Sequence, residues 1–247
     1  MLVMLFSFVV GTERENDFSL NPLCLQSRYD DGMSEIEDAM HSITGNHIDQ
    51  DDMLHAFRAP EGLVMEVTAL AGDSQTRQAI VAWDLMSDGK RIATAKRRFY
   101  VNQGKPCVES YFWMKADQRK RGLVRFILKN TFPRYEAWGI YAAEAHMNAA
   151  GRYVYARLGF SMDKPYPVLK AFEQVAGSTE EYLEAKRLID HPWEFAQWAP
   201  GKAFLLSDAC PSWAGTLIID RKQPGYAHAL KYLNQPLPGP EPSTPVP

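Results

Sequence analysis

The sequence predicts an α/β protein in which helices flank one mixed β-sheet. Strand-like stretches follow one another from Leu63 to Lys115, and strands then alternate with helical stretches from Gly122 onward. Consecutive strands favour antiparallel hairpins, whereas strand–helix–strand units favour parallel pairs, so the two together indicate a mixed sheet. The chain has 247 residues, of which 46% are hydrophobic, and this is enough to bury one sizeable core.

We expect a single domain at residues 33–235, with an extension at each end. Residues 1–32 are the expected N-terminal extension. Their apolar run, Leu2–Val10, is too short to span a bilayer and lacks the basic start of a secretory signal. The proline-rich residues 236–247 cannot build a core and are predicted to form a disordered tail.

Two short helices are expected first within this domain. Residues 34–58 carry apolar side chains at helical spacing, and Ser34 with Glu37 has the pattern of a capping box. Four strands follow, and the Asp-Gly turn within Ser87–Lys90 is expected to close a hairpin. The expected strands are Leu63–Ala71, Ala79–Met86, Ile92–Val101 and Val108–Lys115.

Helices and strands alternate in the remainder of the chain. A helix at Gly122–Arg134 is expected to stop near Pro133. The next helix, Asn148–Leu158, is expected to be closed by Gly159 in the left-handed conformation. The other expected elements are strands Ile140–His146 and Thr216–Asp220 and helices Val168–Gly177, Ser178–Asp190 and His228–Leu233, with Ser178 and Glu181 in a second capping box.

Positive charge is concentrated in the middle of the chain. Residues 90–134 hold thirteen Lys/Arg and two acidic side chains, in a protein whose formal net charge is −3. These basic residues surround a glycine turn, so we interpret the segment as part of an anion site; the alternative is a set of solvated strand and helix faces. The three cysteines lie far apart without CxxC or Cys/His spacing, which argues against a metal site and fits a reducing cytoplasm.

The stretch Val108–Phe160 carries the most specific pattern. An apolar strand runs into the basic turn Arg119–Gly122, and this turn opens a helix. Such a turn presents backbone N–H groups and the positive end of a helix dipole to an anion. Further along, Tyr155 lies on the helix that ends at Gly159.

Together these two units resemble the acyl-CoA core of the GNAT superfamily of N-acetyltransferases. The family's Arg/Gln-x-x-Gly-x-Gly/Ala turn aligns with Arg119, Gly122 and Val124, where a β-branched side chain replaces the small residue and narrows the approach to a pyrophosphate. The family's Asn-x-x-Ala-x-x-Leu-Tyr-x-x-x-Gly-Phe motif aligns with Asn148 and Tyr155. The resemblance implies a GNAT-like fold with a central mixed sheet.

The resemblance also implies acetyl-CoA as the cofactor. In the family, the strand before the turn pairs through its backbone with the pantetheine arm, and the turn binds the pyrophosphate. Arg125 adds charge near the phosphates. The residues that the resemblance assigns to CoA are Trp113, Met114, Lys115, Arg119, Lys120, Arg121, Gly122, Leu123, Val124 and Asn148.

Acyl transfer to an amine needs a proton donor for the departing thiolate and a base for the amine. In many family members the position of Tyr155 supplies the proton, and a phenol with a pKa of about 10 stays protonated at neutral pH. The best candidates for the base are Glu109 and Glu144, and His146 is a third. The alternatives are a packed aromatic at Tyr155 and ordinary ion pairs for the glutamates.

The implied function is transfer of an acetyl group from acetyl-CoA to a primary amine by direct attack in a ternary complex. No Ser-His-Asp or Cys-His arrangement supports a covalent acyl-enzyme. The alternative is a catalytically inactive GNAT-like module that binds CoA or a protein. The acceptor amine belongs to a small molecule or a protein; nucleic acid is less favoured, because CoA accounts for part of the basic charge, and no membrane partner is expected.

An aromatic and acidic insertion is expected before the last strand, at residues 171–215. Its acids attract cations and its aromatic rings stack on them, so one interpretation is a lid over a cationic small molecule. A docking surface for a protein amine and a simple extension of the core are the other two interpretations.

Overall fold

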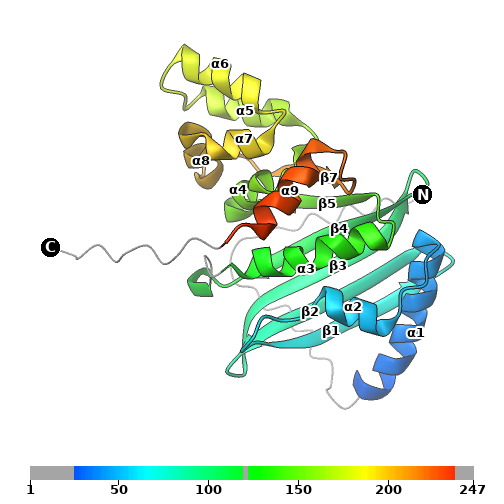
Figure 1. Cartoon of the computed structure of the whole chain (residues 1–247). Helices are drawn as coiled ribbons and strands as arrows, with labels where there is room; N and C mark the ends of the chain where they lie inside the picture. Colours follow the sequence, from blue (N-terminus) through cyan, green and yellow to red (C-terminus); the bar gives the residue numbers. More distant parts are fainter. Residues whose placement is uncertain (1–24, 119–121, 237–247) are drawn as a thin grey trace.

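The computed structural model describes residues 25–118 and 122–236, and it contains one β-sheet with helices packed against it (Figure 1). The strands are β1 (Val64–Asp73), β2 (Gln78–Ser87), β3 (Lys90–Asn102), β4 (Lys105–Met114), β5 (Ala142–Met147), β6 (Ser161–Met162) and β7 (Trp213–Ile218). The helices are α1 (Leu25–Thr44), α2 (Gln50–Ala56), α3 (Leu123–Ala137), α4 (Ala149–Arg157), α5 (Pro165–Glu173), α6 (Thr179–Leu188), α7 (Pro192–Gln197), α8 (Ala199–Leu206) and α9 (Pro224–Asn234), with a 3₁₀ turn, η2, at Ala116–Gln118.

Within the described residues the sheet has seven strands in the order β1-β2-β3-β4-β5-β7-β6. Neighbouring strands from β1 to β4 are antiparallel, β4 and β5 are parallel, and β7 is antiparallel to both β5 and β6. The predicted mixed sheet is therefore confirmed. The four predicted strands before Gly122 and the strand near residue 140 all form, with ends that move by a few residues.

The predicted hairpin between β2 and β3 is confirmed. Ser87 pairs with Lys90, and the two residues between them, Asp88 and Gly89, have φ of 50° and 68°. Positive φ at both central residues matches the right-handed twist of the strands, and Asp-Gly favours it.

Helices α1, α2 and α3 bury one face of the antiparallel half of the sheet. The aromatic rings of Trp83 and Phe99 point to this face and pack with Phe57, the C-cap of α2, and Trp138, the C-cap of α3. Helix α1 lies close over β1, because a Cβ at Gly72 would lie 2.1 Å from the backbone oxygen of Glu35. This face forms the main core.

Two predicted helix boundaries are wrong. Ser34 does not begin a helix, because it lies inside α1, which runs from Leu25. Pro133 does not end α3, which continues to Ala137. Proline costs the helix one hydrogen bond, but the following turn buries Tyr135 completely, and this burial favours continued helix.

The predicted insertion is helical and forms α6, α7 and α8 together with the end of α5. Figure 1 shows α5 to α8 gathered at the end of the molecule beside α4. Phe172 is the centre of this group, with ring centroids of Phe195, Trp198 and Phe204 at 5.7, 5.7 and 5.1 Å. These rings are used for packing, as expected if the insertion extends the core.

The predicted N-cap at Ser178 is confirmed, and the reciprocal half of the capping box is shifted by one residue. The hydroxyl of Ser178 accepts a hydrogen bond from the backbone N–H of Glu181 at 3.2 Å. The carboxylate of Glu181 accepts one from the N–H of Gly177 at 2.8 Å, one residue before the position expected for this motif.

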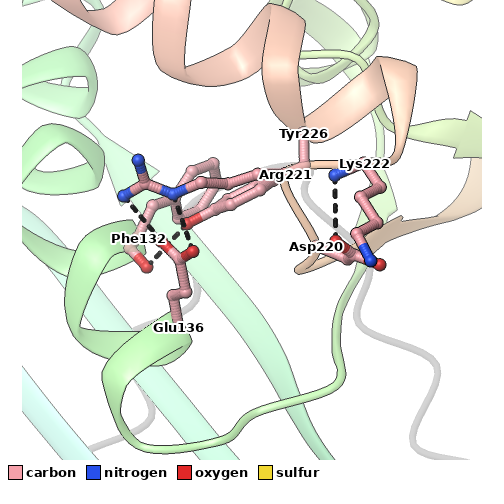
Figure 2. Close-up of polar contacts among 6 residues, drawn as sticks. All are labelled: Phe132, Glu136, Asp220, Arg221, Lys222 and Tyr226. Carbon is pink, nitrogen blue, oxygen red and sulfur yellow. Dashed lines mark hydrogen bonds and ion pairs between the residues drawn. The ribbon is translucent and has the colours of Figure 1, made fainter.

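The last strand and helix differ from the prediction in length. Strand β7 begins three residues before Thr216, and α9 is a helix of 11 residues rather than a single turn, with Pro224 at its start. Figure 2 shows how this region is joined to α3. Arg221 forms two hydrogen bonds to the carboxylate of Glu136, at 2.7 and 3.1 Å, and the Tyr226 hydroxyl donates to the backbone oxygen of Phe132 at 3.0 Å.

Strand β6 was not predicted. It contains two residues, Ser161 and Met162, which pair with Thr216 and Gly215 of β7. Two residues carry no hydrophobic period, so the sequence offers no signal for this strand.

Candidate active site

Strands β4 and β5 separate partway along their length. Their parallel pairing ends at Ser110 and Ala145. Beyond that point β4 stays paired with β3 as far as Met114, and β5 stays paired with β7 as far as Met147. Among the described residues, no strand pairs with the β5-facing edge of β4 at residues 112–114, and we call this place the β4/β5 gap.

A helix begins just beyond each strand that borders the β4/β5 gap. Gly122 is the N-cap of α3 and has φ of 75°, a left-handed conformation that glycine adopts without strain. Asn148 is the N-cap of α4, directly after β5, and its side chain makes no capping hydrogen bond. The first N–H groups of each helix lack carbonyl partners within the helix, so both N-termini favour an anion.

The described members of the predicted CoA set lie near the end of β4 and at the starts of α3 and α4. Trp113 and Met114 lie on the part of β4 that pairs with β3 but not with β5, and Lys115 is exposed just after it. Leu123 is buried and Val124 is partly buried at the start of α3. Arg119, Lys120 and Arg121 lie outside the described residues.

Tyr155 is on α4, partly buried, with its ring edge-on to Phe160 at 4.9 Å between centroids. Burial raises the pKa of its phenol, and the positive charge of Arg97 opposes that rise. Its hydroxyl is therefore protonated at neutral pH. Gly159 closes α4 with φ of 86°, as the sequence predicted.

Glu109 and Glu144 lie directly opposite each other on the parallel strands β4 and β5. Their neighbours Val108 and Ala143 are buried in the core, so both glutamates point to the other face of the sheet, away from α3. Glu109 forms an ion pair with Arg98 at 2.8 Å. His146, two residues after Glu144, is exposed on the same face as the glutamates.

Glu144 accepts a short hydrogen bond from the hydroxyl of Tyr100 and a 3.5 Å bond from Asn102. Burial and the neighbouring Glu144 raise the pKa of the Tyr100 phenol, so Tyr100 stays a donor. The same two causes raise the pKa of the Cys107 thiol to about 11. The described hydrogen-bond donors to Glu144 are therefore neutral, whereas the partner of Glu109 is the cation Arg98.

Sequence reasoning missed Arg97 and Tyr135. Arg97 is on β3 and is 1% exposed; its Nε donates to the hydroxyl of Tyr135 on α3 at 3.1 Å. Its Nη1 donates to the backbone oxygens of Lys96 and Tyr111, each at 3.0 Å. The only sequence signal for a buried Arg97 was its alternation with Ala95 and Phe99, two apolar positions of the same strand.

Several basic residues of the segment 90–134 do not converge on one anion site. Arg91, Arg98 and Arg134 form ion pairs with Asp84, Glu109 and Asp52 respectively. The guanidinium of Arg125 donates instead to the backbone oxygens of Leu233, Gln235 and Pro236 at the end of α9. These four arginines thus join elements of the fold.

Among residues 25–118 and 122–236, no group of three or more His, Cys, Asp or Glu is arranged to hold a metal ion. In those same ranges, every helix is too short or too polar to cross a lipid bilayer.

Three solved structures are similar to part of this chain. Mycobacterium smegmatis RimJ, solved in complex with CoA-disulfide, shows 10% identity and a TM-score of 0.33 over 62% of this chain and 60% of that one. The GNAT domain of S. lividans PAT shows 14% identity and a TM-score of 0.30 over 57% and 79%. Rv2747 from Mycobacterium tuberculosis, in complex with CoA and NLQ, shows 15% identity and a TM-score of 0.29 over 56% and 75%.

The matched part of this chain thus spans less than two thirds of the length of RimJ. No family model matches the sequence. No curated protein matches it either.

Proposed function

We propose that this protein is an acyl-CoA-dependent N-acyltransferase that moves an acetyl group from acetyl-CoA to a primary amine. The observation that carries the proposal is the β4/β5 gap, which opens between two helix N-termini and has Tyr155 on the second helix. An open strand edge supplies backbone hydrogen bonds for an extended pantetheine arm. A helix N-terminus supplies N–H groups for the pyrophosphate.

The cofactor would run along β4 toward the start of α3. Trp113 and Met114 would face the pantetheine, and Gly122 and Leu123 would present the N–H groups of the α3 N-terminus to the pyrophosphate. Asn148 has a side chain free of a capping role, so it is available to contact the arm from the other border of the gap.

The two chemical roles would lie on opposite faces of the sheet. The amine would enter from the face that bears Glu144 and Glu109, and the thiolate would leave on the face that bears Tyr155. The reacting groups would meet in the gap, because the described pairs between β4 and β5 end at Ser110 and Ala145. The amine would lose its proton on one side while the thiolate gains one on the other.

The reaction would be a direct displacement. The amine nitrogen attacks the thioester carbonyl carbon, so a C–N bond forms and the C–S bond breaks. A carboxylate accepts the proton released by the amine, and the Tyr155 hydroxyl gives its proton to the departing thiolate. Of the two carboxylates, Glu144 is the better candidate for the base, because Glu109 is engaged in an ion pair with Arg98.

The proposed function is tested by measuring whether the protein transfers the acetyl group to an amine. The protein is incubated with acetyl-CoA and a panel of primary amines (amino acids, polyamines and peptides), and free thiol is measured together with acetylated product. Amine-dependent thiol release with a matching acetylated product supports the proposal. Binding of acetyl-CoA without thiol release from any amine would contradict it.

A second candidate is a GNAT-like module that binds CoA or a protein without catalysis. The observation that favours it is the engagement of both glutamates, since Glu109 is ion-paired and Glu144 accepts two hydrogen bonds. This candidate predicts acetyl-CoA binding without turnover.

A further inference from the structure

Arg97 is a buried cation without a buried anion. Its side chain is 1% exposed, and in the described part of the chain no carboxylate forms an ion pair with it. Two backbone oxygens, one phenol and the face of Trp83, at 5.3 Å from its Cζ, surround it. These neighbours are neutral, and a buried charge whose partner is missing is costly to maintain.

Not every N–H donor of the guanidinium has an acceptor among the described residues. Nε and Nη1 make its three hydrogen bonds, and Nη2 makes none with the described residues. The indole Nε1 of Trp83, beneath the guanidinium, is likewise buried and has no acceptor within the described ranges. Arg97 Nη2 and Trp83 Nε1 are thus neighbouring N–H donors for which the described residues supply no acceptor.

The position of Arg97 connects it to the β4/β5 gap. Its Nη1 donates to the backbone oxygen of Tyr111, the first residue of β4 beyond the last pair with β5. Its charge acts on the phenol of Tyr155, opposing the rise in pKa that burial causes. The contact with Tyr111 thus places the guanidinium where the gap begins.

We propose that Arg97 binds a carboxylate group of the substrate in the β4/β5 gap, so that the enzyme acts on a carboxylate-bearing acceptor or acyl donor. This inference rests on the proposed function and narrows it to a substrate class. The site lacks a negative charge and strong acceptor oxygens, and a carboxylate supplies both. An Arg–carboxylate contact is a charge-assisted hydrogen bond.

The carboxylate has two sources, the acceptor or the acyl group, and matched pairs of compounds separate them. For the acceptor, the twenty common L-amino acids are compared with their amides, using acetyl-CoA as donor. For the acyl group, succinyl-CoA is compared with butyryl-CoA, which lacks the terminal carboxylate, using one amine that is active with acetyl-CoA.

The expected result is a preference for the carboxylate member of one pair by about tenfold to about 150-fold in kcat/KM, the range for a hydrogen bond to a charged group. Arg97→Met keeps the aliphatic stem and removes the charge, so it is expected to abolish that preference. Arg97→Lys keeps the positive charge but loses the planar pair of N–H donors, so this variant is expected to retain part of the preference for the carboxylate. Tyr135→Phe is the matched control: it removes the partner of Nε and leaves the guanidinium, so the preference is expected to persist.

A wild-type protein that turns over both members of both pairs equally would overturn the inference, and so would an Arg97→Met protein that keeps the preference. If Arg97→Met does not fold, the inference is tested by the carboxylate preference of the wild-type protein and of Arg97→Lys. Calorimetric titration with CoA distinguishes a failure of the carboxylate inference from a failure of the proposed function. CoA binding without any carboxylate preference overturns only the inference, whereas absence of CoA binding overturns both.

Discussion

Glu109 and Glu144 lie directly opposite each other on adjacent parallel strands, yet they have different partners. Glu109 forms an ion pair with Arg98 at 2.8 Å, whereas Glu144 accepts from the neutral phenol of Tyr100. Glu109 thus has a cationic partner, whereas the described partners of Glu144 are neutral. We therefore propose Glu144 as the base.

Glu144→Gln is therefore expected to lower kcat by about 100-fold or more, the usual contribution of a general base. The glutamine oxygen still accepts the hydrogen bond from Tyr100, so the melting temperature should change little. Glu109→Gln is the matched control on the neighbouring strand, with a smaller expected loss of kcat. An equal loss from both substitutions, or none from Glu144→Gln, would argue against this assignment.

Tyr155→Phe removes one hydroxyl from a ring whose packing on Phe160 is otherwise kept. We expect kcat for thiol release to fall by about 100-fold or more, because the thiolate then leaves without a proton donor. The Kd for acetyl-CoA should stay within a few-fold of wild type. Tyr153→Phe, two residues earlier on the same helix, serves as the control and should retain activity. If Tyr155→Phe turns over at the wild-type rate, the role of Tyr155 is structural.

The left-handed turn at Gly159 sets the approach of α4 to α9. A Cβ at Gly159 would lie 2.5 Å from the backbone oxygen of Gly225, and the φ of 86° adds strain. Gly159→Ala should therefore lower the free energy of unfolding by about 2 kcal/mol or more. Gly62→Ala is the matched control, with φ of 81° but nothing within 4 Å, and should cost about 1 kcal/mol. If urea unfolding shows the same loss of unfolding free energy for Gly159→Ala and Gly62→Ala, the close contact with Gly225 does not contribute.

His228 links α9 to the rest of the protein, since its Nε2 lies 3.0 Å from the backbone oxygen of Arg157 and its ring stacks on Trp193. Burial lowers the pKa of His228 below its ordinary 6.5. The unfolded chain then binds the proton more readily, so the stability from this group is present above about pH 6.5 and is lost as the pH falls below it.

The free energy of unfolding, measured in urea between pH 7 and pH 5, should therefore decrease, and His228→Gln should reduce this dependence. The exposed His47→Gln variant is the control and should leave the dependence as it is. A slope that His228→Gln does not change would mean that other groups cause it.

The sequence predicted the elements that carry strong periodicity or a defined turn. The hairpin at Asp88-Gly89 and the glycine C-cap at Gly159 followed from local chemistry, because few residues adopt positive φ. The mixed sheet followed from the order of strands and helices.

Tertiary packing explains what the sequence could not predict. Pro133 is tolerated inside α3 because burial in the following turn compensates for a lost hydrogen bond, and no local signal reports this. Arg97 looked like one of many basic residues, and only the fold shows that it is enclosed by Trp83 and Tyr135. The pairing of β4 with β5 ends at Ser110 and Ala145, and local pattern does not encode where two strands separate.

The most direct test of the central claim is calorimetric titration of acetyl-CoA into the wild-type protein and into Gly122→Asn and Gly122→Asp. Asn and Asp have nearly the same shape, and both are tolerated at positive φ, so the two variants differ by one negative charge beside the proposed pyrophosphate site. The proposal predicts micromolar binding to the wild-type protein, similar or modestly weaker binding to Gly122→Asn, and loss of binding in Gly122→Asp. Absence of binding to the wild-type protein, or equal affinity for the two variants, would contradict a CoA site at the start of α3.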